Sequence, residues 1–166
     1  MAQVEFKDFS FKVRQALEEA SEQFLEEAAS ELQSQAQRKT AVGRVAGGKT
    51  KGDWKHVVDM SKLEATIGNT NENSIWEEFG TGEYALEGKG RKGGWYIPIG
   101  EGEGQISQAV VDAYNMKVVY GKNGMKYAYT VGKKPKRMLF NAYTENKAKI
   151  IKRAQQIFKD RMKDNG

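Results

Sequence analysis

Apolar residues recur at steps of three and four from the start of the chain and predict a long amphipathic helix over residues of about 6–40. The positions on this stripe are Phe6, Phe9, Val13, Leu17, Ala20, Phe24, Ala28, Leu32 and Ala36. Six glutamates lie mostly off the stripe, and the segment is rich in strong helix formers. A helix this long exceeds what a small core covers, so we expect part of the stripe to face a neighbouring subunit.

The end of the chain predicts a second amphipathic helix, over residues of about 137–163, after Pro135. Its apolar face consists of Leu139, Tyr143, Ile150, Ala154, Ile157 and Met162. Lysines and arginines crowd the remaining surface. Cations near a helix C-terminus are favoured by the macrodipole, so part of this basicity has a structural cause.

The centre, residues of about 60–132, alternates short β-branched and aromatic runs with turn signals, which is typical of a small sheet. The expected strands are Leu63–Ile67, Ser74–Phe79, Trp95–Ile99, Met116–Tyr120 and Lys126–Val131. The last two flank Gly121–Gly124, whose Asn-Gly pair predicts a hairpin. Gln105–Ala113 fits a short helix or a strand equally well. We therefore expect a single α+β domain over residues 1–166, with a small antiparallel β-sheet packed by the two long helices.

A long glycine-rich loop interrupts this sheet. Nine of the chain's 18 glycines lie between Gly80 and Gly104. Loops of this length are normally functional or disordered, and a mere linker has no use for large aromatic residues. We interpret the loop as an interface arm that becomes ordered on meeting a partner. Its candidate contact residues are Lys89, Arg91, Lys92, Trp95 and Tyr96. The same residues also suit stacking on nucleic acid.

The amino-acid composition excludes several kinds of covalent, metal and catalytic site. The chain has no cysteine and one histidine, His56, which excludes disulfides, thiolate zinc sites, cysteine nucleophiles and histidine clusters. No apolar run is long enough for a membrane span, and the first residues lack a secretory signal. We expect a protein kept in the cytoplasm, without membrane contact, cofactor or metal.

The segment Gly43–Thr50 satisfies the phosphate-binding pattern G-x-x-x-x-G-K-[ST]. That loop works where it follows a buried strand and opens a helix. Here it follows the polar, helical segment Gln33–Thr40, and Lys51-Gly52-Asp53-Trp54 is a poor helix start. We interpret it as a basic turn.

Two carboxylate pairs are the remaining candidates for catalysis. Glu77 and Glu78 should point to opposite faces of their expected strand, so they cannot share a substrate. Glu101 and Glu103 lie among glycines that give no preorganisation. We expect no enzyme activity.

Charge is distributed unevenly along the chain. Residues 1–39 have a net charge of −3, residues 133–166 have a net charge of +8, and the middle is neutral. This asymmetry suits contact with an acidic surface or with DNA, and it also fits a solvated lysine-rich helix face.

Two stretches carry a resemblance to a known family. Ser74–Gly82 reads Ser-Ile-Trp-Glu-Glu-Phe-Gly-Thr-Gly, and Lys134–Ala142 contains Pro135 at the start of the last helix. Both resemble tail-completion, or head-to-tail joining, components (minor tail proteins) of long-tailed bacteriophages. The sharp part is Glu78, Phe79, Gly80, Thr81 and Gly82. The chain departs from the family pattern in Ile75-Trp76 before the signature, in the long glycine insertion, and in Met138-Leu139-Phe140.

The resemblance implies a structural protein of the virion neck, assembled in the host cytoplasm and acting as a homo-oligomeric ring that binds other tail or neck proteins. The resemblance leaves open whether DNA passes through such a ring, and any contact with DNA there would not be sequence-specific. The acidic first helix and the basic last helix would supply the two unlike surfaces that a closed ring needs. In the signature, we expect Phe79 to anchor the strand end in the core, Gly80 and Gly82 to adopt positive φ, and Glu78 to cap turn amides or meet a basic neighbour. The alternative function is a nucleic-acid-binding module that uses the basic C-terminal helix.

Overall fold

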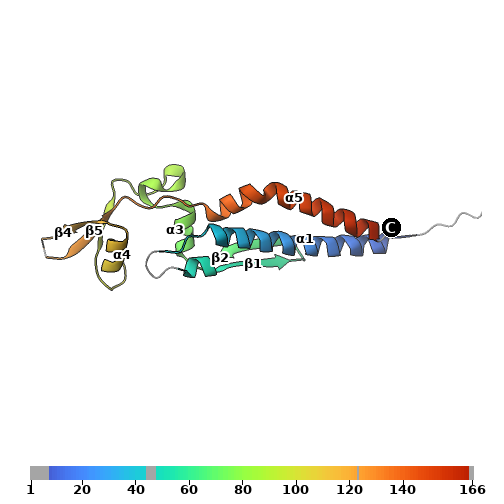
Figure 1. Ribbon diagram of the computed structural model, residues 1–166, viewed down its shortest axis with the longest axis horizontal. Helices are drawn as coiled ribbons and strands as arrows, with labels where there is room; N and C mark the ends of the chain where they lie inside the picture. Colours follow the sequence, from blue (N-terminus) through green and yellow to red (C-terminus); the bar gives the residue numbers. More distant parts are fainter. Residues whose placement is uncertain (1–7, 44–47, 123, 165–166) are drawn as a thin grey trace, which may run out of the picture. The chain divides into compact units, whose positions relative to one another are not determined.

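The computed structural model describes residues 8–43, 48–122 and 124–164 (Figure 1). The expected α+β class is confirmed: two long helices pack with small antiparallel sheets. The chain forms two compact units. Unit 1 consists of Met1–Gln35, Lys55–Gly68 and Ala142–Gly166, and unit 2 consists of Ala36–Trp54 and Asn69–Asn141. Each unit is therefore assembled from segments far apart in the sequence.

Unit 1 is built on helices α1 (Ser10–Lys39) and α5 (Met138–Asp164). The last residues of α1 and the first residues of α5 belong to unit 2. Small side chains line the buried side of α1, namely Ala16, Ala20 and Ala29. Alanine at a helix contact allows a neighbouring element to approach closely. The predicted helix is confirmed, but its expected stripe is only partly right. Ala20 of the stripe is buried, whereas Leu17 is exposed, and Ala16 and Ala29 are buried although they lie off the stripe. Phe6 lies outside the described residues.

Strands β1 (Trp54–Asp59) and β2 (Glu64–Asn69) form a hairpin beside α1. An isolated two-stranded hairpin is marginal in water and needs a surface to pack on. The ring of His56 provides one contact, because it lies within hydrogen-bond distance of Gln33 and Glu26 on α1. Figure 1 shows α1 between this hairpin and α5. Strand β1 was not among the expected strands, although Trp54 and two valines are typical of a strand.

Unit 2 contains a three-stranded antiparallel sheet in the order β3–β5–β4, with β3 Trp95–Pro98, β4 Lys117–Tyr120 and β5 Lys126–Thr130. Ala128 in the central strand lies opposite Ile97 and Val118 and is fully buried. The predicted hairpin is confirmed, with Gly121 N–H donating to Met125 O at 2.9 Å. Asn123 of its turn lies outside the described residues.

The structure contradicts the prediction for one central segment and resolves the open alternative for another. The segment expected as strand Ser74–Phe79 is helix α3 (Asn73–Phe79), so that prediction was wrong. Two asparagine side chains form turns before this helix. Asn69 accepts a hydrogen bond from the amide of Asn71, and Asn71 accepts one from the amide of Asn73, the first residue of α3. The open alternative at Gln105–Ala113 is decided in favour of a short helix, α4 (Gln108–Ala113).

The C-terminal end of α1 is fixed within unit 2 by one hydroxyl group. Thr40 Oγ1 donates to Ala36 O and accepts a hydrogen bond from Trp54 Nε1, both at 2.8 Å. Thr40 and Trp54 are both buried. Because a buried indole N–H is costly to leave unpaired, this contact fixes where the helix stops relative to β1.

Candidate interaction surfaces

The two stretches that carry the family resemblance meet in unit 2. The carboxylate of Glu78 accepts hydrogen bonds from the backbone amides of Leu139 and Phe140, at 2.9 and 3.0 Å. These amides lie in the first turn of α5, where backbone N–H groups have no partner within the helix. The expectation that Glu78 caps amides is confirmed in kind, but the amides belong to α5 and not to its own turn.

Glu77 ties the same two stretches together through lysines. Its carboxylate forms ion pairs with Lys133 and with Lys136. The Lys136 ammonium lies 2.5 Å from Glu77 Oε2, at an angle that does not make a hydrogen bond. The backbone repeats the connection, because Lys136 N–H donates to Glu77 O. Burial, and then the charge of neighbouring Lys136, lower the pKa of Lys133. The expected arrangement of Glu77 and Glu78 on opposite faces of a strand was wrong, since both point toward the start of α5 from one helix.

Close backbone approach explains the glycines of the signature. Gly80 and Gly82 have φ of +74° and +59°, as expected. A Cβ at Gly82 would lie 2.3 Å from Val131 O and 2.7 Å from the Trp95 ring, and one at Gly80 would lie 2.8 Å from Pro135. Between them, Thr81 N–H donates to Lys133 O. Glycine is required here by contact as well as by conformation.

The outward face of α3 is apolar. Ile75, Trp76 and Phe79 are 55%, 55% and 56% exposed. Phe79 therefore does not anchor the core, which corrects the sequence-based expectation. Large apolar side chains gathered on one exposed face typically mark an interaction surface.

The glycine-rich loop folds back on its own unit. It contains two short 3-10 turns, Gly82–Tyr84 and Leu86–Gly88, and then enters β3. Glu83 N–H donates to Val131 O, and Gly93 N–H donates to the Glu83 carboxylate. The loop is therefore held by contacts within this chain, and is not a projecting segment.

The residues of the predicted arm lie in and after this loop. Lys89, Arg91 and Lys92 are exposed, Trp95 and Tyr96 belong to β3, and Arg91 lies over the Trp95 ring at 5.5 Å. The Tyr96 ring contacts that of Tyr129 in β5. Their assignment to an interface stays a prediction.

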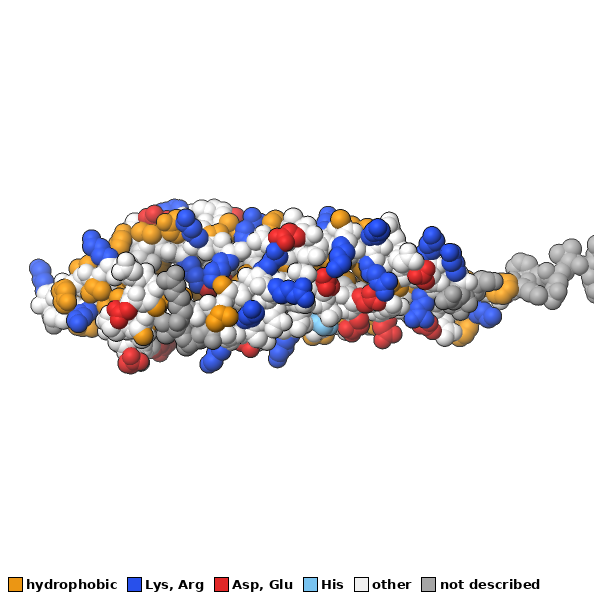
Figure 2. Space-filling model, in the orientation of Figure 1, with side chains coloured by type: hydrophobic (Ala, Val, Ile, Leu, Met, Phe, Trp, Pro, Cys, Tyr) orange, Lys and Arg blue, Asp and Glu red, His pale blue; other side chains and the backbone are white. Residues whose placement is uncertain are grey.

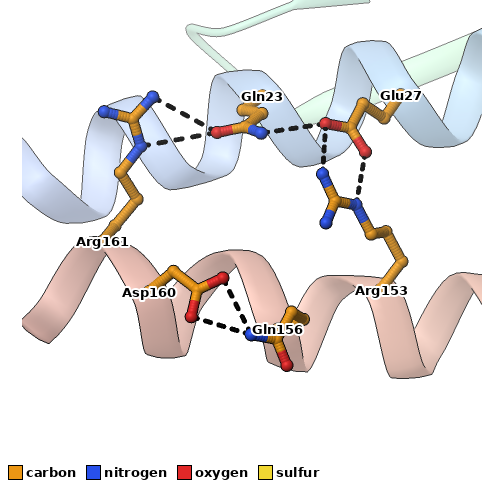
Figure 3. A network of polar contacts seen from close by, with 6 residues as sticks. All are labelled: Gln23, Glu27, Arg153, Gln156, Asp160 and Arg161. Atoms are coloured by element: carbon orange, nitrogen blue, oxygen red, sulfur yellow. Dashed lines mark hydrogen bonds and ion pairs between the residues drawn. The ribbon is translucent and has the colours of Figure 1, made fainter.

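Acidic and basic side chains pair across α1 and α5 within unit 1 (Figure 3). Arg153 donates two hydrogen bonds to Glu27, at 2.6 and 2.9 Å, and Arg161 contacts both Glu19 and Gln23. Lys149 pairs with Glu31 further along. The hydrogen bonds from Arg153, with a further one from Gln23, lower the pKa of Glu27 to about 2. We call this set of pairs the α1–α5 seam.

The α1–α5 seam contradicts one expectation about how copies of the chain would meet. The acidic first helix and basic last helix were expected to meet between copies, yet these pairs form within one chain. Unit 1 carries twelve Lys and Arg against thirteen Asp and Glu, a net charge of −1, and unit 2 carries fifteen against nine, a net charge of +6. Figure 2 shows the two signs interleaved over the α1–α5 seam. The excess positive charge therefore belongs to unit 2.

A groove of about 680 Å³ runs along the seam. Phe24, Ala28 and Ile150 supply apolar lining, and the Glu27–Arg153 and Glu31–Lys149 pairs lie at the same groove. The two carboxylates at the groove, Glu27 and Glu31, form ion pairs with Arg153 and Lys149, so they are not placed as a pair for acid and base catalysis. It is a polar-rimmed surface cleft.

The phosphate-loop pattern is only partly described. Arg44–Gly47 lie outside the described residues. Gly48 has φ of +117°, and the last two residues of the motif, Lys49 and Thr50, begin α2 (Lys49–Gly52), which is a single helical turn. The motif follows α1, not a buried strand. Its interpretation as a basic turn stays a prediction.

Two further site classes find no support in the described parts of the chain. No group of three or more His, Cys, Asp or Glu side chains is placed to hold a metal ion there. Nor do the described residues include a helix that is long and apolar enough to cross a bilayer.

Comparison with protein-family models, with curated sequences and with solved structures gives no significant match. Of the residues expected from the sequence, Glu78 binds the first amides of α5, Gly80 lies against Pro135, and Gly82 lies against Val131 and Trp95. The contacts of Glu77 with Lys133 and Lys136, and the α1–α5 seam, were not predicted from the sequence. The opposite net charges of the two ends of the chain were the signal for that seam.

Proposed function

We propose that this protein is a structural, non-enzymatic component of a long-tailed phage virion that acts in the neck, at tail completion or head-to-tail joining. It binds further copies of itself in a ring and contacts neighbouring tail or neck proteins. The observation that supports this most is the junction between Ser74–Gly82 and Lys134–Ala142. The two stretches that resemble the family are far apart in the sequence, yet Glu77, Glu78 and Gly80 join them directly.

The composition of the surface supports binding over chemistry. In unit 2 the exposed apolar face of α3 lies beside a cation-rich stretch, residues 131–141, and the carboxylates in between are used for capping and ion pairs. Carboxylates fixed in this way stabilise the fold and are poor general bases, since their lone pairs are occupied.

The test is genetic and microscopic. In the phage that encodes the chain, disruption of its gene should leave DNA-filled heads and separate tails in the lysate, seen by negative-stain electron microscopy. Supplying the wild-type chain in trans should restore joined particles, and the tagged chain should be found in them. Normal, infectious particles formed without the protein would overturn the proposal.

The alternative is nucleic-acid binding by the basic C-terminal helix. The seam occupies Lys149, Arg153 and Arg161, whereas Lys152 and Lys159 make no ion pair within the described residues. DNA affinity that falls steeply with salt and is removed by Lys152→Glu with Lys159→Glu would favour this alternative. Arg153 is a poor choice for that test because its replacement also breaks the pair with Glu27.

A further inference from the structure

Helix α3 is amphipathic with its polar side inward. At about 100° per residue, Ile75, Phe79 and Trp76 fall within one arc of about 100°. The opposite arc holds Ser74 and Glu77, of which Ser74 is 7% exposed and the Glu77 side chain is 15% exposed. A helix that serves only its own core places its apolar side inward, so the core does not explain this arrangement.

The charges around α3 favour one kind of partner. Residues 74–82 and 131–141 together carry two carboxylates and four cations, a net charge of +2. Both carboxylates are already bound, by lysines and by the amides of α5. A complementary surface would therefore present apolar side chains together with unpaired carboxylates.

The first half of α1 has this composition. Phe11 is 76% exposed, and Glu18 and Glu22 follow it at steps of seven and four, so all three lie on one line of the helix. Glu18 and Glu22 are exposed and make no ion pair in the part of the chain that the structure describes. Residues 8–22 carry four acidic and two basic side chains, a net charge of −2.

We propose that the exposed face of α3 (Ile75, Trp76, Phe79) binds the Phe11–Glu18–Glu22 line of α1 in a second copy of this chain. The contact is heterologous, because two different surfaces meet, and such contacts generate rings or filaments. The inference deepens the proposed function and rests on it for the self-association. The proposed intersubunit contact does not use the α1–α5 seam, because the acidic and basic side chains there already pair within one chain.

Two variants test the contact by complementation. The α3 variant carries Trp76→Ser and Phe79→Ser, and the α1 variant carries Phe11→Ser and Glu22→Lys. Each should associate at least about 30-fold more weakly than wild type, the loss typical of central interface residues. Mixed one to one, they should form a dimer with one of each, since each keeps one intact surface. Analytical ultracentrifugation measures both results, and unchanged circular dichroism shows that the variants are folded.

The control is Tyr120→Ser, which removes another exposed aromatic side chain of unit 2, 69% exposed, away from α3. It should associate as wild type does, and added salt should weaken wild-type association because the surfaces are oppositely charged. The inference is overturned by a wild-type chain that stays monomeric, by an α3 variant that still associates, or by variants that do not pair when mixed. Each of these results leaves incorporation into virions, and hence the proposed function, open to its own genetic test.

Discussion

Glu78 and Leu139 are joined by a hydrogen bond of 2.9 Å between a side-chain carboxylate and a backbone amide 61 residues away. The second oxygen of Glu78 accepts from Phe140, so one side chain supplies the cap that α5 lacks locally. The residue before α5 is Arg137, which has φ of +52° and no side-chain oxygen to cap with. A negative charge at this position also suits the positive end of the α5 dipole.

Replacing Glu78 tests this cap. We expect Glu78→Ala to lower the free energy of unfolding of unit 2 by about 1–2 kcal/mol, because two amides in the first turn of α5 lose their acceptor. All three tryptophans lie in unit 2, so tryptophan fluorescence during urea unfolding reports on that unit. The control Glu103→Ala changes an exposed glutamate and should shift the midpoint little. Equal midpoints for the two variants would contradict the capping role.

Alanine substitutions at Gly82 and Gly88 distinguish the effect of steric contact from that of backbone strain. We expect Gly82→Ala to destabilise unit 2 by more than about 2 kcal/mol, because its Cβ would lie 2.3 Å from Val131 O. Gly88 is the matched control, with φ of +67° and nothing within 4 Å of its Cβ position. Gly88→Ala should therefore cost only the strain of positive φ, about 1 kcal/mol. The same fluorescence measurement compares them, and similar losses would mean that the approach to Val131 is unimportant.

The Glu27–Arg153 pair makes unit 1 sensitive to acid. The pKa of Glu27 falls from 4.5 to about 2 on folding, so its contribution is present above pH 4.5 and is lost as the pH falls toward 2. We expect the urea midpoint of the helical circular dichroism signal to fall over this range. In Glu27→Gln the fall should be smaller, whereas the control Glu18→Gln changes a glutamate that makes no ion pair among the described residues and should behave as wild type does. A Glu27→Gln profile identical to wild type would contradict the assignment.

The buried alanines of α1 predict an unusual mutational pattern. Ala29→Leu should destabilise unit 1 by about 1–3 kcal/mol, although leucine is a good helix former, because no space remains at a residue that is 1% exposed. Leu17→Ala should cost less than about 1 kcal/mol, because Leu17 is already 42% exposed. Thermal unfolding followed by circular dichroism compares the two. The reverse order would mean that the apolar stripe predicted from the sequence is the one that packs.

The two long helices, strands β2 to β5 and the hairpin at Gly121–Gly124 were predictable from the sequence alone. These elements depend on local causes: periodicity, helix propensity, β-branched runs and an Asn-Gly turn. Positive φ at Gly80 and Gly82 was predictable for the same reason. The local pattern was also misleading, since Ser74–Phe79 has strand-forming residues but belongs to a helix whose first amide, that of Asn73, donates to the Asn71 side chain.

Which surfaces are used within the chain, and which are left exposed, follows from the packing of segments that are distant in the sequence. The sequence placed acid at one end and base at the other, but pairing across the α1–α5 seam needed the two helices to be side by side. The inward polar side of α3 depends in the same way on Lys133, Lys136 and the first amides of α5. Charges and hydrogen-bond partners act through space over a few ångströms, and a sequence pattern does not specify which distant segments come that close.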